Sequence, residues 1–220
     1  MSEIMEDKYT RSRILFGDEN LQTLQKSKIL LLGVGGVGSY ALDCLYRNGV
    51  EDITIVDFDE YDVTNQNRQM WSELHLGESK VASLQIHYPN VTIIEKRIDK
   101  TWVDEYDFEP YDLVLDAIDD VGAKVALAKK TYKKLISSMG SAKQMDPTKI
   151  AVTSIWKTTE DPFARKIRYQ LKKERFNKNY QVIYSLEQNK CTEKGSFCGV
   201  TGAFGLTMCS LAMRKILGMK

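Results

Sequence analysis

A glycine-rich turn between a buried strand and a helix is the feature that most restricts how this chain can fold. Residues 28–32 (KILLL) form a short apolar run, typical of a strand buried in a parallel sheet. The run leads into GVGGVG at positions 33–38, which fits the pattern G-x-G-x-x-G, and residues 39–48 then predict a helix. Glycines at this spacing permit a tight turn and close approach of the backbone to a phosphate. The segment therefore predicts a βαβ unit that binds a nucleotide.

The alternation of strand and helix continues along the chain. Apolar runs predict further strands at 53–57, 91–96, 112–117 and 134–139, separated by predicted helices at 79–88 and 121–133. Repeated units of this length predict an α/β fold with a Rossmann-like, doubly wound and mostly parallel sheet. After Pro147 the pattern changes and predicts a C-terminal α+β extension. This extension has strands at 150–156 and 181–186, an amphipathic helix at 162–176 and a last helix near 199–217.

Length and composition favour one domain. With 220 residues, 43% of them hydrophobic, the chain can bury one sizeable core but not two. We expect an N-terminal helical arm at 1–27, a nucleotide-binding core at 28–140, and a substrate-facing extension with the C-terminal helix at 141–220. Four irregularly spaced cysteines without a C-x-x-C pair argue against a disulfide framework and a zinc site, and favour the cytoplasm. Charged residues interrupt the apolar C-terminal stretch, so no membrane span is expected.

Asp57 provides the second part of a nucleotide site. It ends the second predicted strand, nineteen residues after Gly38, where a carboxylate is placed to bond the hydroxyls of a ribose. The helix N-terminus adds free N–H groups and partial positive charge for a phosphate. The glycine turn alone does not distinguish NAD from ATP, so an NAD-dependent Rossmann module is an alternative at this point.

The residues that follow resemble one enzyme superfamily. They read DFDEYDVTNQNRQ from Asp57 and continue to GESK at 77–80, similar to D-x-D-x-V-x-x-x-N-x-x-R-Q and G-x-x-K in the E1-like ThiF/MoeB/HesA superfamily. The resemblance implies an E1-like activating-enzyme fold of the ligase class, with ATP and Mg²⁺ as cofactors and a monovalent cation as a further one. The ATP-binding residues that it implies are Gly33, Gly35, Gly36, Gly38, Asp57, Asp59, Asn65, Arg68, Lys80 and Lys124.

Catalytic roles follow from the same resemblance. Arg68 and Lys80 are implied to stabilise charge on the phosphates, Arg68 as a planar fork and Lys80 as a point charge. In DAIDD at 116–120, Asp119 is the implied catalytic, Mg²⁺-binding carboxylate. Asp116 either is structural or lies beside the metal, and Asp120 is interpreted as a helix cap.

The segment Lys8-Tyr9-Thr10-Arg11 resembles the superfamily's R-[YF]-x-R, with lysine in place of the first arginine. In the superfamily this arginine reaches the ATP of the partner subunit. The resemblance therefore implies a homodimer in which Arg11 acts in trans.

Residues 140–173 narrow the resemblance to one branch. They are similar to G-x-x-x-Q-x-DPT and KT-x-x-DP in the tRNA threonylcarbamoyladenosine dehydratases. The implied activity is ATP-dependent dehydration of N6-threonylcarbamoyladenosine at position 37 of tRNA, in which activation of the side-chain carboxylate leads to cyclisation. The alternative is an adenylyltransferase that activates the C-terminal glycine of a ubiquitin-like sulfur carrier. The zinc C-x-x-C pairs typical of those adenylyltransferases are absent from the sequence.

A tRNA substrate predicts a cationic surface. Residues 157–178 contain eight basic and three acidic residues, whereas 99–120 contains nine acidic residues and one lysine. Phosphate contacts dominate the affinity of such surfaces for nucleic acid. Arg165 and Arg168 are the candidate tRNA contacts, and a solvated helix face is the alternative interpretation.

Cys198 lies in FCGVTGAFG, which resembles a C-x-x-x-G segment of the family. One interpretation is a functional thiol, which acts as a catalytic nucleophile or accepts sulfur from a partner protein. The other is a small buried residue at the start of a helix. Cys191 is the rival candidate for a functional thiol. His75 and His87 have no metal-binding spacing, and we expect them on helix surfaces.

Overall fold

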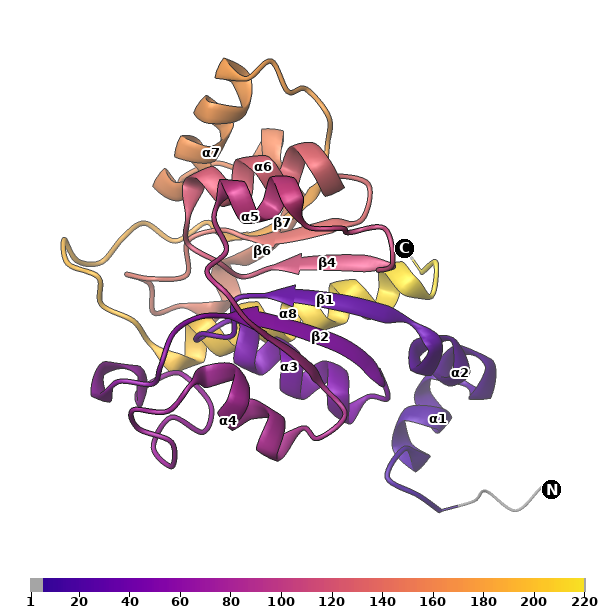
Figure 1. Cartoon of the computed structure of the whole chain (residues 1–220). Coiled ribbons are helices and arrows are strands. Elements are labelled where there is room, and N and C mark those ends of the chain that lie inside the picture. Colours follow the sequence, from indigo (N-terminus) through magenta and orange to yellow (C-terminus); the bar gives the residue numbers. More distant parts are fainter. Residues whose placement is uncertain (1–5, 220) are drawn as a thin grey trace.

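Seven strands form a single sheet in the order β3-β2-β1-β4-β5-β7-β6 (Figure 1). The computed structural model describes residues 6–219, so positions 1–5 of the expected arm lie outside the described residues. β6 pairs antiparallel with β7, and the other strand pairs are parallel. The strands are β1 (Lys28–Leu32), β2 (Asp52–Asp57), β3 (Thr92–Glu95), β4 (Leu113–Asp116), β5 (Leu135–Ser138), β6 (Ile150–Ser154) and β7 (Gln181–Ser185). The predicted fold class is confirmed.

The strand order reverses beside β1. From β1 the chain runs outward to β2 and β3, and then returns to place β4 on the other side of β1. Open α/β sheets bind ligands at the carboxyl ends of the strands where such a reversal occurs. The glycine turn follows β1 at this edge and residues 117–120 follow β4, so the topology brings two of the predicted site segments together.

Helices cover both faces of the sheet (Figure 1). One face packs against α3, α4 and α8 through residues such as Leu42, Val81 and Phe204. The other face packs against α5, α6 and α7 through residues such as Val103 and Ile167. The α-helices are α1 (Thr10–Phe16), α2 (Asp18–Lys26), α3 (Gly38–Arg47), α4 (Lys80–His87), α5 (Lys100–Glu105), α6 (Val121–Thr131), α7 (Pro162–Lys173) and α8 (Cys198–Ile216). Among these helices none has the length and apolar character that a membrane crossing requires.

The last helix, α8, packs unusually closely on α3. A Cβ at Gly205 would overlap the carbonyl oxygen of Val37 and lie 2.9 Å from the backbone nitrogen of Ala41. A Cβ at Gly202 would meet the ring of Tyr40 at 3.3 Å. Glycines in α8 therefore let its first turns approach the start of α3, next to the glycine turn.

The structure adds detail to the sequence-based expectation. The described part of the N-terminal arm consists of two helices, α1 and α2. The short helix α5, capped by Asp99, was not predicted, because six residues with one buried apolar side chain show no readable period. The C-terminal extension joins the main sheet: β7 lies parallel to β5 within it, and β6 forms its edge.

Substitution Gly205→Ala tests the close packing of α3 and α8. We expect the free energy of unfolding to fall by about 2–3 kcal/mol, because the new methyl group overlaps the backbone of α3, although alanine favours a helix by about 1 kcal/mol over glycine. Urea denaturation measures the change. Ser210→Ala, on the exposed side of the same helix, is the control and should shift stability by about 0.5 kcal/mol or less. A Gly205→Ala protein as stable as wild type would contradict this account.

Candidate functional site

Glycine is required at two positions of the turn after β1. Gly33 has a φ of +83°, a conformation that side chains disfavour, and its N–H donates to the carbonyl of Val56 (2.8 Å). A Cβ at Gly38 would overlap the carbonyl oxygen of Gly33. The chain thus folds back tightly at the carboxyl end of β1, and α3 begins directly at the turn with its N-terminus free for an anion.

Asp57 connects the turn to the neighbouring strand. One carboxylate oxygen accepts a hydrogen bond from the N–H of Val34 (2.8 Å), and the other accepts one from the N–H of Asp59 (3.0 Å). The side chain is buried at the carboxyl end of β2. Asp57 therefore holds the glycine turn and the segment that follows β2 in one arrangement.

Arg68 and Asn65 lie on the segment after β2. A short 3-10 turn, η1 (Val63–Asn65), is capped by Asp62. The Asp62 side chain accepts hydrogen bonds from the N–H of Thr64 and from the side-chain amide of Asn65. Arg68 follows, and its guanidinium donates to the carbonyl of Thr64 (2.7 Å). Its Cγ lies 3.1 Å from the position that a Cβ on Gly36 would occupy. The structure therefore brings Arg68 against the glycine turn.

Lys80, at the start of α4, is buried and forms an ion pair with Asp59 (2.9 Å). The backbone N–H of Lys80 also donates to the carbonyl of Asp59. The two residues come from segments 21 positions apart in the sequence. The ion pair thus holds the Lys80 ammonium group next to Asp59, two residues after the end of β2.

Two polar side-chain atoms next to the turn have no hydrogen-bond partner within the described structure. Gln69 Oε1 and Thr201 Oγ1 are buried and make no hydrogen bond. The Gln69 amide lies 3.7 Å from the Cβ position of Gly35, and Thr201 Cβ lies 3.3 Å from that of Gly36. Because buried polar groups are normally hydrogen-bonded, these atoms indicate space for a polar ligand at the turn. Neither residue was predicted to have a role, although Gln69 ends the N-x-x-R-Q pattern at positions 65–69.

Lys124 and Asp116 form a buried ion pair beneath this edge of the sheet. Lys124 Nζ donates to Asp116 Oδ2 (2.8 Å), to the hydroxyl of Ser137 (3.2 Å) and to the carbonyl of Ser138 (2.7 Å). Burial lowers the pKa of Lys124, and the Asp116 carboxylate opposes this shift. All three donors of Lys124 are therefore used inside the protein, so its predicted contact with a phosphate stays a prediction. For Asp116 the structure shows the structural role.

Asp119 and Asp120 follow β4 but differ in environment. Asp120 caps α6 by accepting from the N–H of Ala123 (2.7 Å), which confirms its predicted role. The Asp119 side chain is 91% exposed and lies 3.6 Å from Lys194. Among residues 6–219, no group of three or more His, Cys, Asp or Glu side chains is arranged to hold a metal ion. Mg²⁺ often binds through one or two carboxylates and substrate phosphates, and Asp119 fits that kind of site.

The remaining candidates lie in different parts of the molecule. Arg11 is exposed on α1. This helix lies at the amino ends of the strands, opposite the glycine turn (Figure 1). Cys198 begins α8 beside the turn, and its thiol is hydrogen-bonded to the hydroxyl of Tyr40 (2.7 Å). Burial, and then this contact, raise the pKa of Tyr40 to about 12, so the phenol stays protonated at neutral pH. Cys191 is exposed in the loop before α8.

The two candidate tRNA contacts share α7 but not an environment. Arg165 is exposed, whereas Arg168 is half-buried and donates to the hydroxyl of Thr158. Asp161 caps this helix and also accepts from the N–H of Gly140. Asp161 thus joins the start of α7, which carries both arginines, to the loop after β5.

His75 and His87 were expected on helix surfaces, but His75 lies in the loop before α4 and contacts His87, the last residue of α4. Their Nε2 atoms are 2.8 Å apart, and His75 Nδ1 lies 2.7 Å from Glu78. His87 also stacks on Trp71, with ring centroids 3.8 Å apart. Burial, followed by the charge of His75, lowers the pKa of His87. This cluster packs the segment between Arg68 and Lys80 onto α4.

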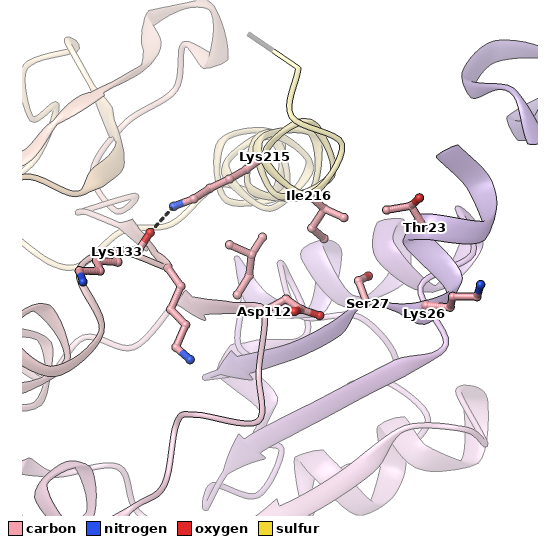
Figure 2. Close-up of a pocket in the computed structure, with 9 residues that line it drawn as sticks. Thr23, Lys26, Ser27, Asp112, Lys133, Lys215 and Ile216 are labelled. Carbon is pink, nitrogen blue, oxygen red and sulfur yellow. Dashed lines mark hydrogen bonds between the residues drawn. The ribbon is translucent and has the colours of Figure 1, made fainter. Parts of the chain in front are cut away.

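A cavity of about 490 Å³ lies at the amino ends of the strands, away from the glycine turn. Figure 2 shows Lys26, Asp112, Lys133 and Lys215 among its lining residues. Lys215 donates to the carbonyl of Lys133 (3.1 Å), and burial lowers its pKa. Because this cavity is at the end of the sheet opposite the glycine turn, it is not part of the candidate nucleotide site.

Substitution Asp116→Asn tests the buried ion pair. We expect the free energy of unfolding to fall by about 3 kcal/mol or more, because Lys124 would be left as an uncompensated buried charge. Glu174→Gln, which removes an exposed partner of Lys129, is the matched control and should cost below about 1 kcal/mol. Equal effects of the two variants in urea denaturation would disprove the structural role of the pair.

Residues 9–220 match the ThiF family. The tRNA threonylcarbamoyladenosine dehydratase of Bacillus subtilis is 38% identical over 190 residues, which cover 81% of this chain and 74% of that protein. The Escherichia coli enzyme of the same name is 34% identical, covering 78% of this chain and 68% of that protein. The solved structure of the E. coli enzyme in complex with ATP has a TM-score of 0.90 and 30% identity, covering 99% of this chain and 96% of that one.

Proposed function

The chain belongs to the ThiF family, and within it to the tRNA threonylcarbamoyladenosine dehydratases, and we propose on this basis that it is an ATP-dependent enzyme that cyclises N6-threonylcarbamoyladenosine at position 37 of tRNA. The observation that carries the proposal is the convergence of Arg68, Gln69 and Thr201 on the glycine turn. Glycine turns at helix N-termini commonly bind phosphate. The unpartnered atoms Gln69 Oε1 and Thr201 Oγ1 at this turn support a polar ligand there.

The reaction needs a carboxylate to become a good electrophile. The side-chain carboxylate of the modified base attacks the α-phosphate of ATP and displaces pyrophosphate. The carbamoyl part then attacks the activated carbonyl carbon and displaces AMP, so the ring closes with net loss of water. Arg68 supplies positive charge to the phosphates next to Gly36, and Lys80 adds charge from the start of α4. Asp57 binds the ribose of the nucleotide, and Asn65 bonds the ribose or a phosphate, with Asp59 orienting Lys80.

Asp119 is the residue that would hold Mg²⁺, since it is exposed at the carboxyl end of β4. A bound Mg²⁺ neutralises charge that develops on phosphate oxygens. Lys124 contributes through its buried pair with Asp116, which fixes the start of α6 and the loop that carries Asp119. A monovalent cation is a further element of this proposal.

A homodimer would supply Arg11 to the partner's nucleotide. α1, which carries Arg11, lies at the amino ends of the strands, on the side of its own subunit opposite the glycine turn (Figure 1). This position supports a role for Arg11 in trans. Ile14 and Leu15 on the same helix are 61% and 76% exposed, which supports a subunit contact there.

The tRNA would contact the extension formed by residues 141–220. We assign Arg165 to its phosphates and Arg168 to the support of that surface. Cys198, or the exposed Cys191, would serve any sulfur relay with a partner protein. The unpaired thiols suit a cytoplasmic enzyme.

Incubation of the purified protein with ATP, Mg²⁺ and tRNA that carries the open modified base tests the proposed function. Nucleoside mass spectrometry should show loss of one water. Asp119→Asn should lower kcat at least about 100-fold, because the charge that develops on the phosphate oxygens would no longer be neutralised by Mg²⁺. Asp104→Asn, at an exposed position, is the control and should keep activity. An unchanged base, together with adenylation of a carrier peptide's C-terminal glycine, would instead identify an adenylyltransferase.

Mixing two inactive variants tests the action of Arg11 in trans. Arg11→Ala and Asp119→Asn should each be nearly inactive alone. After subunit exchange, half of the dimers are mixed and each has one intact site, so activity should recover to about a quarter of wild type. No recovery in mixtures that native mass spectrometry shows to be heterodimeric would place Arg11 in its own subunit's site.

A further inference from the structure

The first turn of α8 is fixed against the glycine turn. Thr201 Cβ lies 3.3 Å from the Cβ position of Gly36. The hydroxyl of Tyr40, on α3, is hydrogen-bonded to Cys198. The side-chain amide of Asn67 donates to the carbonyl of Ser196 (2.9 Å), just before the helix. A second helix N-terminus therefore lies beside that of α3.

This second N-terminus has unused hydrogen-bond donors. No side chain caps α8, whose first residue follows Phe197. The N–H groups of Val200 and Thr201 donate to the carbonyl of Phe197. Within residues 6–219, those of Cys198 and Gly199 have no acceptor. An uncapped helix of 19 residues presents these groups, with the positive end of its dipole, to an anion.

The hydroxyl of Thr201 is an independent sign of a ligand. The side chain is 3% exposed, and Oγ1 makes no hydrogen bond. A threonine in a helix commonly donates to the carbonyl four residues earlier, as Thr207 does to Ala203 (2.7 Å) in this same helix. Thr201 does not do so, and its buried hydroxyl remains available beside Gly36. Such a group is costly to leave without a partner.

We propose that the first turn of α8, with Thr201 as donor, binds the substrate carboxylate that is activated by ATP. This inference rests on the proposed function. Adenylation must hold two anions, a carboxylate and an α-phosphate, in contact. The N-terminus of α3 and Arg68 serve the phosphate, and the N-terminus of α8 provides a separate positive end for the carboxylate. Gly36 borders both Arg68 and Thr201, so the two anions would meet at this residue.

Thr201→Val and Thr201→Ser separate the hydroxyl from the shape of the side chain. Valine keeps the shape and loses the donor, whereas serine keeps the donor. We expect Thr201→Val to lower kcat/KM for the modified tRNA about 10-fold to 100-fold at saturating ATP, since a hydrogen bond to a charged group is lost. Thr201→Ser should stay within about 3-fold of wild type. The Kd for ATP, measured by calorimetry, and the thermal midpoint should not worsen in Thr201→Val, because no protein contact of the hydroxyl is removed.

The outcomes distinguish this inference from the proposed function. Wild-type turnover with equal kcat/KM in all three proteins overturns the carboxylate subsite alone. A parallel loss of ATP affinity in Thr201→Val also overturns it, because the hydroxyl would then serve a phosphate. Absence of wild-type turnover overturns the proposed function, and the subsite with it.

Discussion

Glycines that leave no room for a side chain determine where both helix N-termini lie at the candidate site. Gly38 starts α3 against the carbonyl of Gly33, and Gly205 lets α8 approach the backbone at Val37. With a side chain at either position, one helix would move away from the carboxyl end of β1. Arg68 and Thr201 would then no longer border Gly36. The geometry of the proposed phosphate and carboxylate sites thus depends on backbone contact distances.

The carboxyl end of β4 carries both buried and exposed charged side chains. The Lys124–Asp116 pair is buried, and its hydrogen bonds to Ser137 and Ser138 join β4, β5 and α6. A buried pair of this kind adds little net stability compared with an apolar core, but it restricts the arrangement of the elements that contribute to it. Asp119, three residues after Asp116, is exposed on the surface beside Lys194. One short segment therefore supplies both a structural carboxylate and the carboxylate that is proposed to hold Mg²⁺.

The C-terminal third of the chain contributes to the site from two directions. β7 extends the parallel sheet beside β5, and α7 is anchored to the loop after β5 by Asp161. α8 then returns under the sheet and brings Cys198 and Thr201 to the glycine turn (Figure 1). The segment that resembles a tRNA-modifying branch in sequence is thus continuous with the nucleotide core in structure.

The sequence by itself determined the parallel α/β fold, the glycine turn and the order of Asp57, Arg68, Lys80 and Asp119. These features are readable because strand and helix periods and motif spacings are local along the chain. The tertiary structure decided what depends on distant segments meeting. It paired Lys124 with Asp116, joined His75 to His87, and placed the unpartnered Thr201 beside Gly36. No local pattern specifies such contacts, because burial and partners follow from how α4, α6 and α8 pack on the sheet.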